Sequence, residues 1–242
     1  MNRLLTINNY LLAAFVLAEL PFVWLLSAQP EFESSWRIAH LGQMLVLMGW
    51  LLLANRELSP EFKNTGRWLF AGLVFSFIGD VINSRLIDLS SIVEPQIFLS
   101  IIPFAATQLI YALLFWQAAQ RSPQIFQYKR LSLLAWPIIT LLLWSQILAD
   151  GMPTVLMAAT LIYAAMVLLM MVTSSWLWRA WGGAGLPLFA GAAIFVSSDA
   201  TIGYNISQGH SPAGWSAHYI WVSYIVAQCL IVRLALIRQQ QS

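Results

Sequence analysis

The sequence predicts an all-α integral membrane protein: a polytopic bundle of eight transmembrane helices in a single domain covering residues 1–242. Two features of the composition carry this prediction. Hydrophobic residues make up 60% of the chain and charged residues only 9%, whereas about a quarter of the residues of a soluble domain are charged. The chain also contains 12 tryptophans, which is typical of aromatic belts at two membrane faces rather than of one globular core.

Eight apolar stretches are long enough to cross a hydrocarbon layer of about 30 Å, which takes roughly 20 helical residues. The first stretch ends in small residues, as a signal peptide does, but Glu19 and Pro21 interrupt its apolar run, so we interpret it as a helix. The connections between stretches are short, and no soluble domain is expected outside the bundle. The predicted spans are residues 10–27, 38–53, 68–83, 97–117, 131–148, 153–174, 186–204 and 217–236.

The basic residues predict the orientation of the bundle. If the N-terminus is cytoplasmic, ten of the 12 lysines and arginines fall on the cytoplasmic side, and only Arg37 and Arg85 fall outside. This asymmetry follows the positive-inside rule, so both the N-terminus and the C-terminus are expected in the cytoplasm and the number of spans is expected to be even. The inside residues are Arg3, Arg56, Lys63, Arg67, Arg121, Lys129, Arg130, Arg179, Arg233 and Arg238.

The composition also excludes several functional classes. The single Cys229 rules out an intramolecular disulfide and a cysteine-cluster metal site. A net charge of +2 without any basic run gives no reason to expect a nucleic-acid partner. The Gly182–Gly185 stretch lacks the lysine and the strand context of a phosphate-binding loop. We therefore expect no metal and no cofactor.

Two acidic residues stand at corresponding positions inside apolar spans. Asp80 lies in the third span and Asp199 in the seventh, and each follows an Ala-Gly pair by nine and eight positions. The next span carries a glutamine in both cases, 28 residues after Asp80 and 29 residues after Asp199. Because both acid-bearing spans run outward, the pattern is that of a parallel four-plus-four internal repeat, although so few residues match that coincidence stays open. The pairs are Ala71-Gly72 and Ala190-Gly191.

The pattern places both aspartates at similar depth in the outer half of the bilayer, and both glutamines near the middle of the neighbouring spans. Positions three or four apart are neighbours on a helix. A tyrosine lies three or four residues from each glutamine, and an asparagine lies three residues after the first acid. We therefore expect one cavity, lined by Asp80, Asp199, Gln108, Gln228, Tyr111, Tyr224 and Asn83.

Two carboxyl groups in such a cavity suit acid–base chemistry. An ionisable group in the membrane interior is costly, and it is a functional hypothesis by default. Like charges resist joint ionisation, so one aspartate is expected to be protonated and to act as an acid. The other is expected to be ionised and to act as a base or as a charge stabiliser. The alternative, that each aspartate only hydrogen-bonds a neighbouring helix, stays open.

The same residues resemble the signatures of the YhhN-like membrane proteins, a family that includes the lysoplasmalogenases. The resemblance covers most of the chain, with eight helices in the expected order. It implies hydrolysis of the vinyl ether bond of a lysoplasmalogen, which releases a fatty aldehyde and a glycerophospho-alcohol. The motifs are Gly79-Asp80 in the third span, Ser198-Asp199 followed by Asn205 around the seventh, and Tyr224-Ile-Val-Ala-Gln228 with Leu230-Ile231 in the eighth.

Two positions depart from the family pattern. Family members commonly carry a Lys-Pro pair in the second helix, where this chain has His40 and no lysine. The fourth helix commonly has a histidine three residues before its tyrosine, and Gln108 takes that place here. Glutamine donates and accepts hydrogen bonds but shuttles no proton. The departures therefore bear on the reaction more than on the fold.

The chemistry of vinyl ether hydrolysis assigns roles to the candidate residues. Protonation of the alkene carbon gives an oxocarbenium ion, to which water adds. Asp80 and Asp199 are expected to supply the acid and the stabilising carboxylate, in either order. Gln108 or Asn205 is expected to hold the water, with Ser198 as a supporting residue.

Two further charged residues are candidates near this site. Glu19 is either a third acid of the cavity or faces a water-filled kink beside Pro21. Arg85 lies three residues before Asp88 beyond the end of the third span. It either pairs with Asp88 or contacts a substrate phosphate at the outer surface, as arginine forks do.

The three histidines give no metal site. His40 begins the second span and is expected at the outer membrane interface. His210 and His218 flank the last outer loop without nearby acids or cysteines, and we interpret them as loop residues.

Three functional classes follow from these patterns. The first is a membrane hydrolase acting on an ether lipid, located in the cell membrane and, in a bacterium, in the inner membrane. The second is a proton-coupled transporter of a small molecule or lipid, because one acid per half at matching depth also suits alternating access. The third is a noncatalytic lipid-binding protein. The expected partners are a lysophospholipid or ether-lipid substrate and membrane lipids.

Overall fold

A computed structural model describes residues 2–28, 33–85, 87, 89, 91–92, 97–120, 122–146, 154–208 and 214–241. The described residues form eight long α-helices, a short C-terminal helix and two single turns of 3₁₀ helix, which confirms the predicted all-α class. The long helices are α1 (Asn2–Ala28), α2 (Glu33–Glu57), α3 (Pro60–Asn83), α4 (Ile97–Ala119), α5 (Phe126–Ser145), α6 (Thr154–Trp181), α7 (Leu186–Ser207) and α8 (Trp215–Ile231). The short elements are α9 (Leu234–Gln240), η2 (Pro123–Ile125) and η3 (Gly182–Ala184).

Seven segments of the described chain are long and apolar enough to cross a membrane, and they lie in α1, α2, α3, α4, α6, α7 and the joined α8 and α9. Helix α5 is not among them because its first turn carries Lys129 and Arg130, although it is as long as a membrane span requires. A helix satisfies all its backbone hydrogen bonds internally, which is why apolar segments in lipid adopt this structure. The chain is therefore a multi-pass membrane protein with seven or eight spans.

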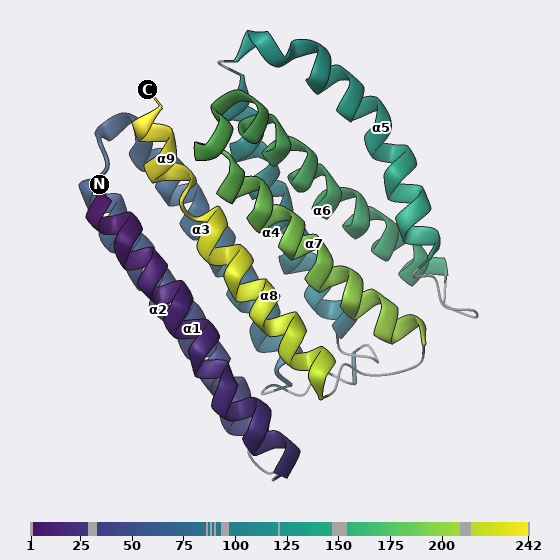
Figure 1. The fold of residues 1–242 in the computed structure, drawn as a ribbon. Coiled ribbons are helices and arrows are strands. Elements are labelled where there is room, and N and C mark those ends of the chain that lie inside the picture. The colour runs from purple at the N-terminus through teal and green to yellow at the C-terminus, as the bar shows by residue number, and fades with distance from the viewer. Residues whose placement is uncertain are drawn as a thin grey trace.

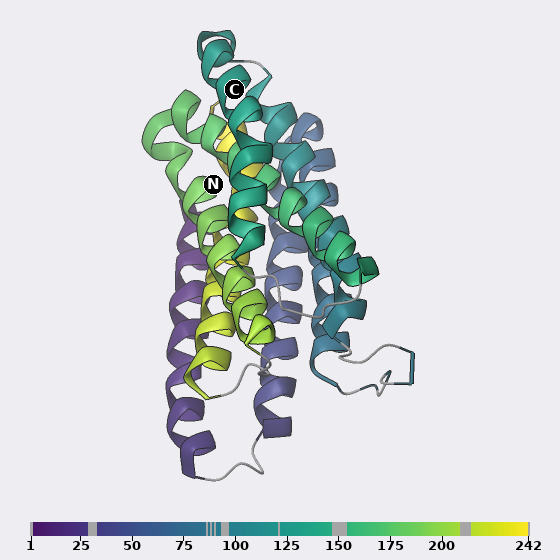
Figure 2. The same ribbon diagram turned by 90° about the vertical axis from the view of Figure 1, so that its right-hand side faces the viewer.

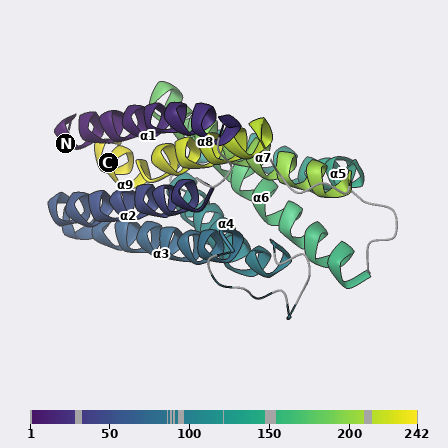
Figure 3. The ribbon, with the colours of Figure 1, turned by 90° about the horizontal axis from the view of Figure 1, so that it is seen from below.

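The eight long helices alternate in direction, so both termini lie toward the same end of the bundle (Figures 1 and 2). This arrangement agrees with an even number of crossings. Seen from below, α1, α8 and α7 lie on one side of the bundle and α2, α3 and α4 on the other (Figure 3). Helix α6 packs against α4 and α7. Helix α5 packs mainly on α6 and lies at the edge of the bundle (Figure 1).

The observed helices differ from the predicted spans mainly at their ends. Helix α3 begins at Pro60, well before the predicted span of 68–83, because the helix continues through polar turns that hydropathy does not detect. Proline suits this first position because it has no N–H to leave unpaired. The last predicted span, 217–236, is interrupted at Val232 and Arg233, and α9 follows as a separate short helix. At this interruption, Arg233 Nε donates a hydrogen bond to Asn8 Oδ1 of α1 over 2.6 Å.

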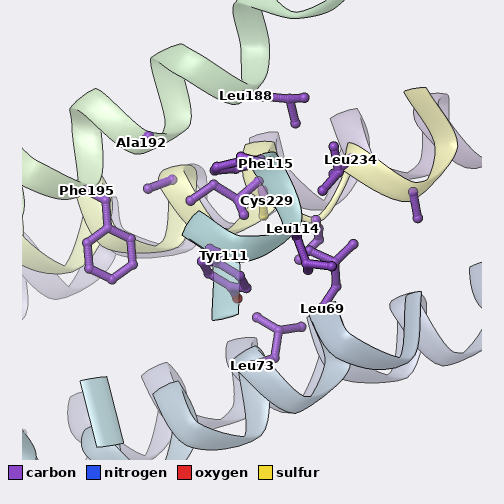
Figure 4. Close-up of a cluster of buried hydrophobic side chains, with 14 of the residues drawn as sticks. Leu69, Leu73, Tyr111, Leu114, Phe115, Leu188, Ala192, Phe195, Cys229 and Leu234 are labelled. Atoms are coloured by element: carbon purple, nitrogen blue, oxygen red, sulfur yellow. The ribbon is translucent and has the colours of Figure 1, made fainter. Parts of the chain in front are cut away.

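The two Ala-Gly pairs of the predicted repeat have the same packing role. A Cβ atom on Gly72 of α3 would lie 2.4 Å from the Tyr111 ring of α4. A Cβ atom on Gly191 of α7 would lie 2.9 Å from Leu230 of α8. Each glycine thus lets the acid-bearing helix approach the next helix of its half closely. Tyr111 is fully buried by this approach and lies within the central apolar cluster, near Leu73 (Figure 4).

Candidate active site

Asp80 is held by a tyrosine from the last long helix. Its side chain lies in the final turn of α3 and is 8% exposed. The Tyr224 hydroxyl of α8 donates to Asp80 Oδ2 over 2.7 Å. Gly79 makes room for this contact, because a Cβ atom there would lie 2.7 Å from the Phe104 ring, which packs edge-on against Tyr224. The conformation of Asp80 is therefore fixed by groups from α4 and α8.

Asp199 has an equivalent partner on a different helix. The Tyr163 hydroxyl of α6 donates to Asp199 Oδ2 of α7 over 2.7 Å. Tyr163 also interacts electrostatically with Asp80. The two carboxyl groups therefore belong to one region of the bundle, and the Tyr163 hydroxyl bonds Asp199. Asp199 is half-buried and is the more accessible of the two acids.

A buried hydrogen-bond network lies beside Asp80. The Tyr111 hydroxyl donates to Gln228 Oε1 over 2.8 Å, and Gln228 Nε2 donates to Ser76 Oγ over 2.8 Å. The chain continues from Ser76 to Thr107 over 3.3 Å and from Thr107 to the Gly72 carbonyl over 3.0 Å. These bonds join α3, α4 and α8 in the interior of the bundle. Because a half-satisfied polar network in such surroundings would be costly, its completeness fixes the relative positions of the three helices.

Gln108 differs from Gln228 in its hydrogen bonding. Its side chain is fully buried, yet neither amide atom meets hydrogen-bonding geometry with a described residue. The amide lies beside the Tyr163 hydroxyl. Buried polar groups are normally paired. Gln108 therefore presents its amide beside the tyrosine that holds Asp199.

The structure brings together most of the residues expected to line one cavity, but with different pairings. Tyr111 was expected to share a helix face with Gln108, and the structure adds that its hydroxyl bonds Gln228 on another helix. Tyr224 bonds Asp80 rather than its helical neighbour Gln228. Asn83 is half-buried near the end of α3, and its Oδ1 has no partner among the described residues.

The other supporting candidates lie around this region. Ser198 Oγ donates to the Ile220 carbonyl over 2.9 Å and thereby ties α7 to α8. Asn205 Nδ2 donates to the carbonyl of Thr201 one turn earlier, over 2.7 Å. Arg85 is exposed just beyond α3, with a φ of 53°. Its proposed partner Asp88 lies outside the described residues.

Three residues of the site escaped prediction: Tyr163, Ser76 and Thr107. A sequence signal existed for two of them. Tyr163 is a lone tyrosine in an apolar run, and the hydroxyl of a buried tyrosine usually needs a partner. Ser76 lies four residues before Asp80 and so shares its helix face. Thr107 bonds a carbonyl one turn earlier, at Pro103, and showed no such signal.

Glu19 belongs to a second, separate group of polar residues, which we call the Glu19 cluster: Glu19, Trp36, His40 and His218. The Glu19 carboxylate of α1 accepts hydrogen bonds from Trp36 Nε1 over 2.7 Å and lies 3.0 Å from His40 Nε2 and 2.7 Å from His218 Nδ1. The prediction of His218 as a loop residue is wrong, because α8 begins at Trp215 and His218 is buried one turn into it. His40 is also buried among protein side chains. His210 lies outside the described residues.

Fold and site together define a multi-pass helical membrane protein with two carboxyl groups inside the bundle, each bonded to a tyrosine. Comparison with known families identifies the class further. The YhhN family model matches residues 37–235, which is most of the chain, and the chain belongs to this family. No curated protein and no solved structure matches the chain.

Proposed function

We propose that the protein is a membrane hydrolase of the lysoplasmalogenase type, which cleaves the vinyl ether bond of a lysoplasmalogen. The observation that carries this proposal is that Asp80 and Asp199 are each held by the hydroxyl of a tyrosine from another helix. Two carboxyl groups from different helices flank one buried region, and the unpaired amide of Gln108 lies within it. Membership of the YhhN family is compatible with this activity.

The reaction needs little more than the groups present. A protonated aspartate transfers its proton to the alkene carbon β to the ether oxygen. An oxocarbenium ion then forms at the carbon that bears this oxygen. The ionised aspartate stabilises that cation. It then accepts a proton as water adds to the cationic carbon. The hemiacetal collapses to a fatty aldehyde and a glycerophospho-alcohol, so one water is consumed and the carboxyl protons are restored.

Gln108 is the better of the two candidates for holding the water. The Asn205 amide nitrogen already donates to its own helix backbone. Gln108 lies next to Tyr163, and neither of its amide atoms meets hydrogen-bonding geometry with a described residue. An amide of this kind can accept from a water and orient its lone pair without exchanging a proton. Gln108 therefore positions the nucleophile, and the aspartates carry the proton transfers.

The head group of the substrate is expected at the end of the bundle away from the termini. Arg85 lies exposed there, directly after the helix that carries Asp80. Arg37 of α2 reaches the same end, where its guanidinium donates to the Ser84 carbonyl over 2.5 Å. An arginine at this position would bind a phosphate while the alkenyl chain extends toward the acids. With both termini in the cytoplasm, this end would face the outside of the cell membrane.

The proposal is tested with purified protein in detergent. A lysoplasmalogen is the substrate, and the matched lysophospholipid with a saturated ether chain is the control, because it has no alkene to protonate. We expect aldehyde release from the first lipid and none from the second. Substrate flux in liposomes without product would instead support a transporter, and binding with neither product nor flux would support a noncatalytic lipid-binding protein.

Removing the tyrosine hydroxyls tests whether catalysis requires each aspartate to be hydrogen-bonded to its tyrosine. Tyr224→Phe and Tyr163→Phe each delete one hydrogen bond of 2.7 Å to an aspartate. Hydrogen bonds to charged groups contribute about 1.5–3 kcal/mol. Each variant is therefore expected to lower kcat by about tenfold to a hundredfold. Tyr204→Phe, which changes an exposed tyrosine on α7, is the control. Wild-type rates in both site variants would contradict the assignment.

Substitution of Gln108 separates the positioning of water from binding of the lipid. Gln108→Leu keeps the size of the side chain but removes the donor and the acceptor, so kcat should fall by about tenfold with little change in KM. Gln108→His restores a polar ring at the same place and should retain more activity than the leucine variant. Equal rates for the leucine variant and the wild type would remove Gln108 from the mechanism.

A further inference from the structure

The Glu19 cluster is the most polar group of the bundle outside the aspartate site. Glu19 is only 2% exposed, and its carboxylate is surrounded by side chains of α2 and α8. The Trp36 ring packs edge-on against both histidine rings, with centroids 4.4 Å and 5.1 Å away. Burying a carboxylate is costly unless it is paired and hydrogen-bonded. The cluster meets this condition by bringing three partners to one acid.

The cluster is saturated and therefore does not form a ligand site. Both oxygens of Glu19 are engaged, Oε1 by Trp36 and His218 and Oε2 by His40. Among the described residues, no group of acids, histidines and cysteine is arranged to hold a metal ion. A carboxylate held in this way gives rigidity to its surroundings.

The cluster is connected to the aspartate site through Trp221. The His40 ring stacks on the Trp221 ring at 4.0 Å with an interplanar angle of 9°. The Trp221 indole N–H donates to Gln43 Oε1 over 3.0 Å, so α2 holds the indole both through its face and through its nitrogen. The Trp221 ring in turn lies 5.1 Å from the Tyr224 ring. His218, Trp221 and Tyr224 follow one face of α8 at helical spacing.

The Tyr224 ring touches three aromatic rings, and Trp221 is the one fixed by the cluster. The other two are Phe195 of α7 and Phe104 of α4, which pack edge-on against Tyr224 at 5.4 Å and 6.1 Å. Loss of the stacked His40 would leave the Trp221 face without support. The Tyr224 ring could then tilt, and its hydroxyl would leave the 2.7 Å contact with Asp80.

We propose that the Glu19 cluster is a positioning device that, through His40 and Trp221, holds the Tyr224 hydroxyl on Asp80. Glu19 and Trp36 precede the residues matched by the family model, so this device uses a part of the chain that the match does not cover. The role of this device in catalysis rests on the proposed function. Its effect on the Tyr224–Asp80 contact is independent of that function, because it concerns the structure alone.

The test compares two alanine substitutions in α1. Glu19→Ala removes the acceptor of all three cluster bonds. Asn8→Ala removes the bond to Arg233 near the other end of the same helix, and so loosens α1 without touching Trp221. The readout is the infrared carboxyl stretch of Asp80 in protein carrying isotope-labelled aspartate, assigned by its loss in Asp80→Asn. This stretch reports the hydrogen bond from Tyr224 and needs no substrate.

We expect the Asp80 stretch in Glu19→Ala to move toward its position in Tyr224→Phe and to stay at the wild-type position in Asn8→Ala. In the hydrolase assay, kcat should fall by about tenfold in Glu19→Ala alone. If Glu19→Ala does not fold, His40→Leu gives the same comparison, because it removes the ring stacked on Trp221 together with its bond to Glu19. An unchanged Asp80 stretch in a folded variant would overturn the proposal. If the Asp80 stretch shifts in Glu19→Ala but the wild-type protein releases no aldehyde, the positioning role stands and the proposed hydrolase function is rejected.

Discussion

Replacement of either membrane aspartate by asparagine is expected to abolish aldehyde release. Asp80→Asn and Asp199→Asn keep the size of the side chain and an oxygen able to accept from Tyr224 or Tyr163. Each substitution removes one of the two carboxyl groups, so the remaining aspartate can no longer work with a partner that donates the proton or stabilises the cation. Acid–base groups contribute about 10²–10⁴-fold to such rates, so both variants should fall to the limit of detection in an assay of released aldehyde.

The matched control for these variants is Glu61→Gln. Glu61 is an exposed acid in the first turn of the same helix as Asp80, at the opposite end from the site. The substitution removes one negative charge from α3 in the same way but should leave the rate at the wild-type value. Full activity in both aspartate variants would show that the pair has only a structural role in helix packing.

Gly72→Ala is expected to destabilise the protein strongly. The added Cβ atom would lie 2.4 Å from the Tyr111 ring, which is fully buried and has no room to retreat. Overpacking of this kind typically costs about 1–3 kcal/mol. A displaced Tyr111 also loses its bond to Gln228, whose amide positions Ser76 beside Asp80. The midpoint of thermal unfolding in detergent should therefore fall, together with activity.

Gly49→Ala is the control for the effect of an added methyl group. A Cβ atom at Gly49, within α2, meets nothing within 4 Å. Alanine is favoured over glycine inside a helix by about 0.5–1 kcal/mol, so this variant should be at least as stable as the wild type. Equal stability of the Gly72 and Gly49 variants would contradict the close approach of α3 and α4.

The fold was largely predictable because the membrane imposes its own requirements on a sequence. Each span has to be apolar for about the thickness of the hydrocarbon layer, and this length is visible in the sequence. The ends of the helices were less predictable. The first turns of α3 are polar, and α9 is a short helix set off by two residues, so neither carries a hydropathy signal of its own.

The two acids were predictable because charge inside an apolar span is rare, but their partners were not. Helical spacing relates residues of one helix only, and it suggested that Tyr111 accompanies Gln108. The structure pairs residues across helices, with Tyr224 on Asp80 and Tyr163 on Asp199. Such contacts depend on how the helices cross, which small residues such as Gly72 and Gly79 set by allowing close approach.

The Glu19 cluster shows the same limit of sequence reasoning. Glu19, His40 and His218 lie far apart in the chain. Taken alone, Glu19 suggested a third acid of the cavity or a kink, His40 suggested the membrane interface, and His218 suggested a loop. Their meeting requires α1, α2 and α8 to pack together, an arrangement that no local pattern contains. An acid and two histidines at comparable depth in separate spans were the only available signal.

The most direct test of the central claim is the mass of the aldehyde that the purified protein releases from a lysoplasmalogen in heavy water. Protonation of the alkene carbon by a solvent-exchanged aspartate places one deuteron on the carbon next to the aldehyde group. Aldehyde trapped immediately by reduction, with an authentic unlabelled aldehyde carried through the same steps, separates this deuteron from later exchange. The account predicts aldehyde carrying one deuteron from the wild type and none released by Asp80→Asn or Asp199→Asn. Absence of aldehyde from the wild type, or release of aldehyde without the deuteron, would contradict it.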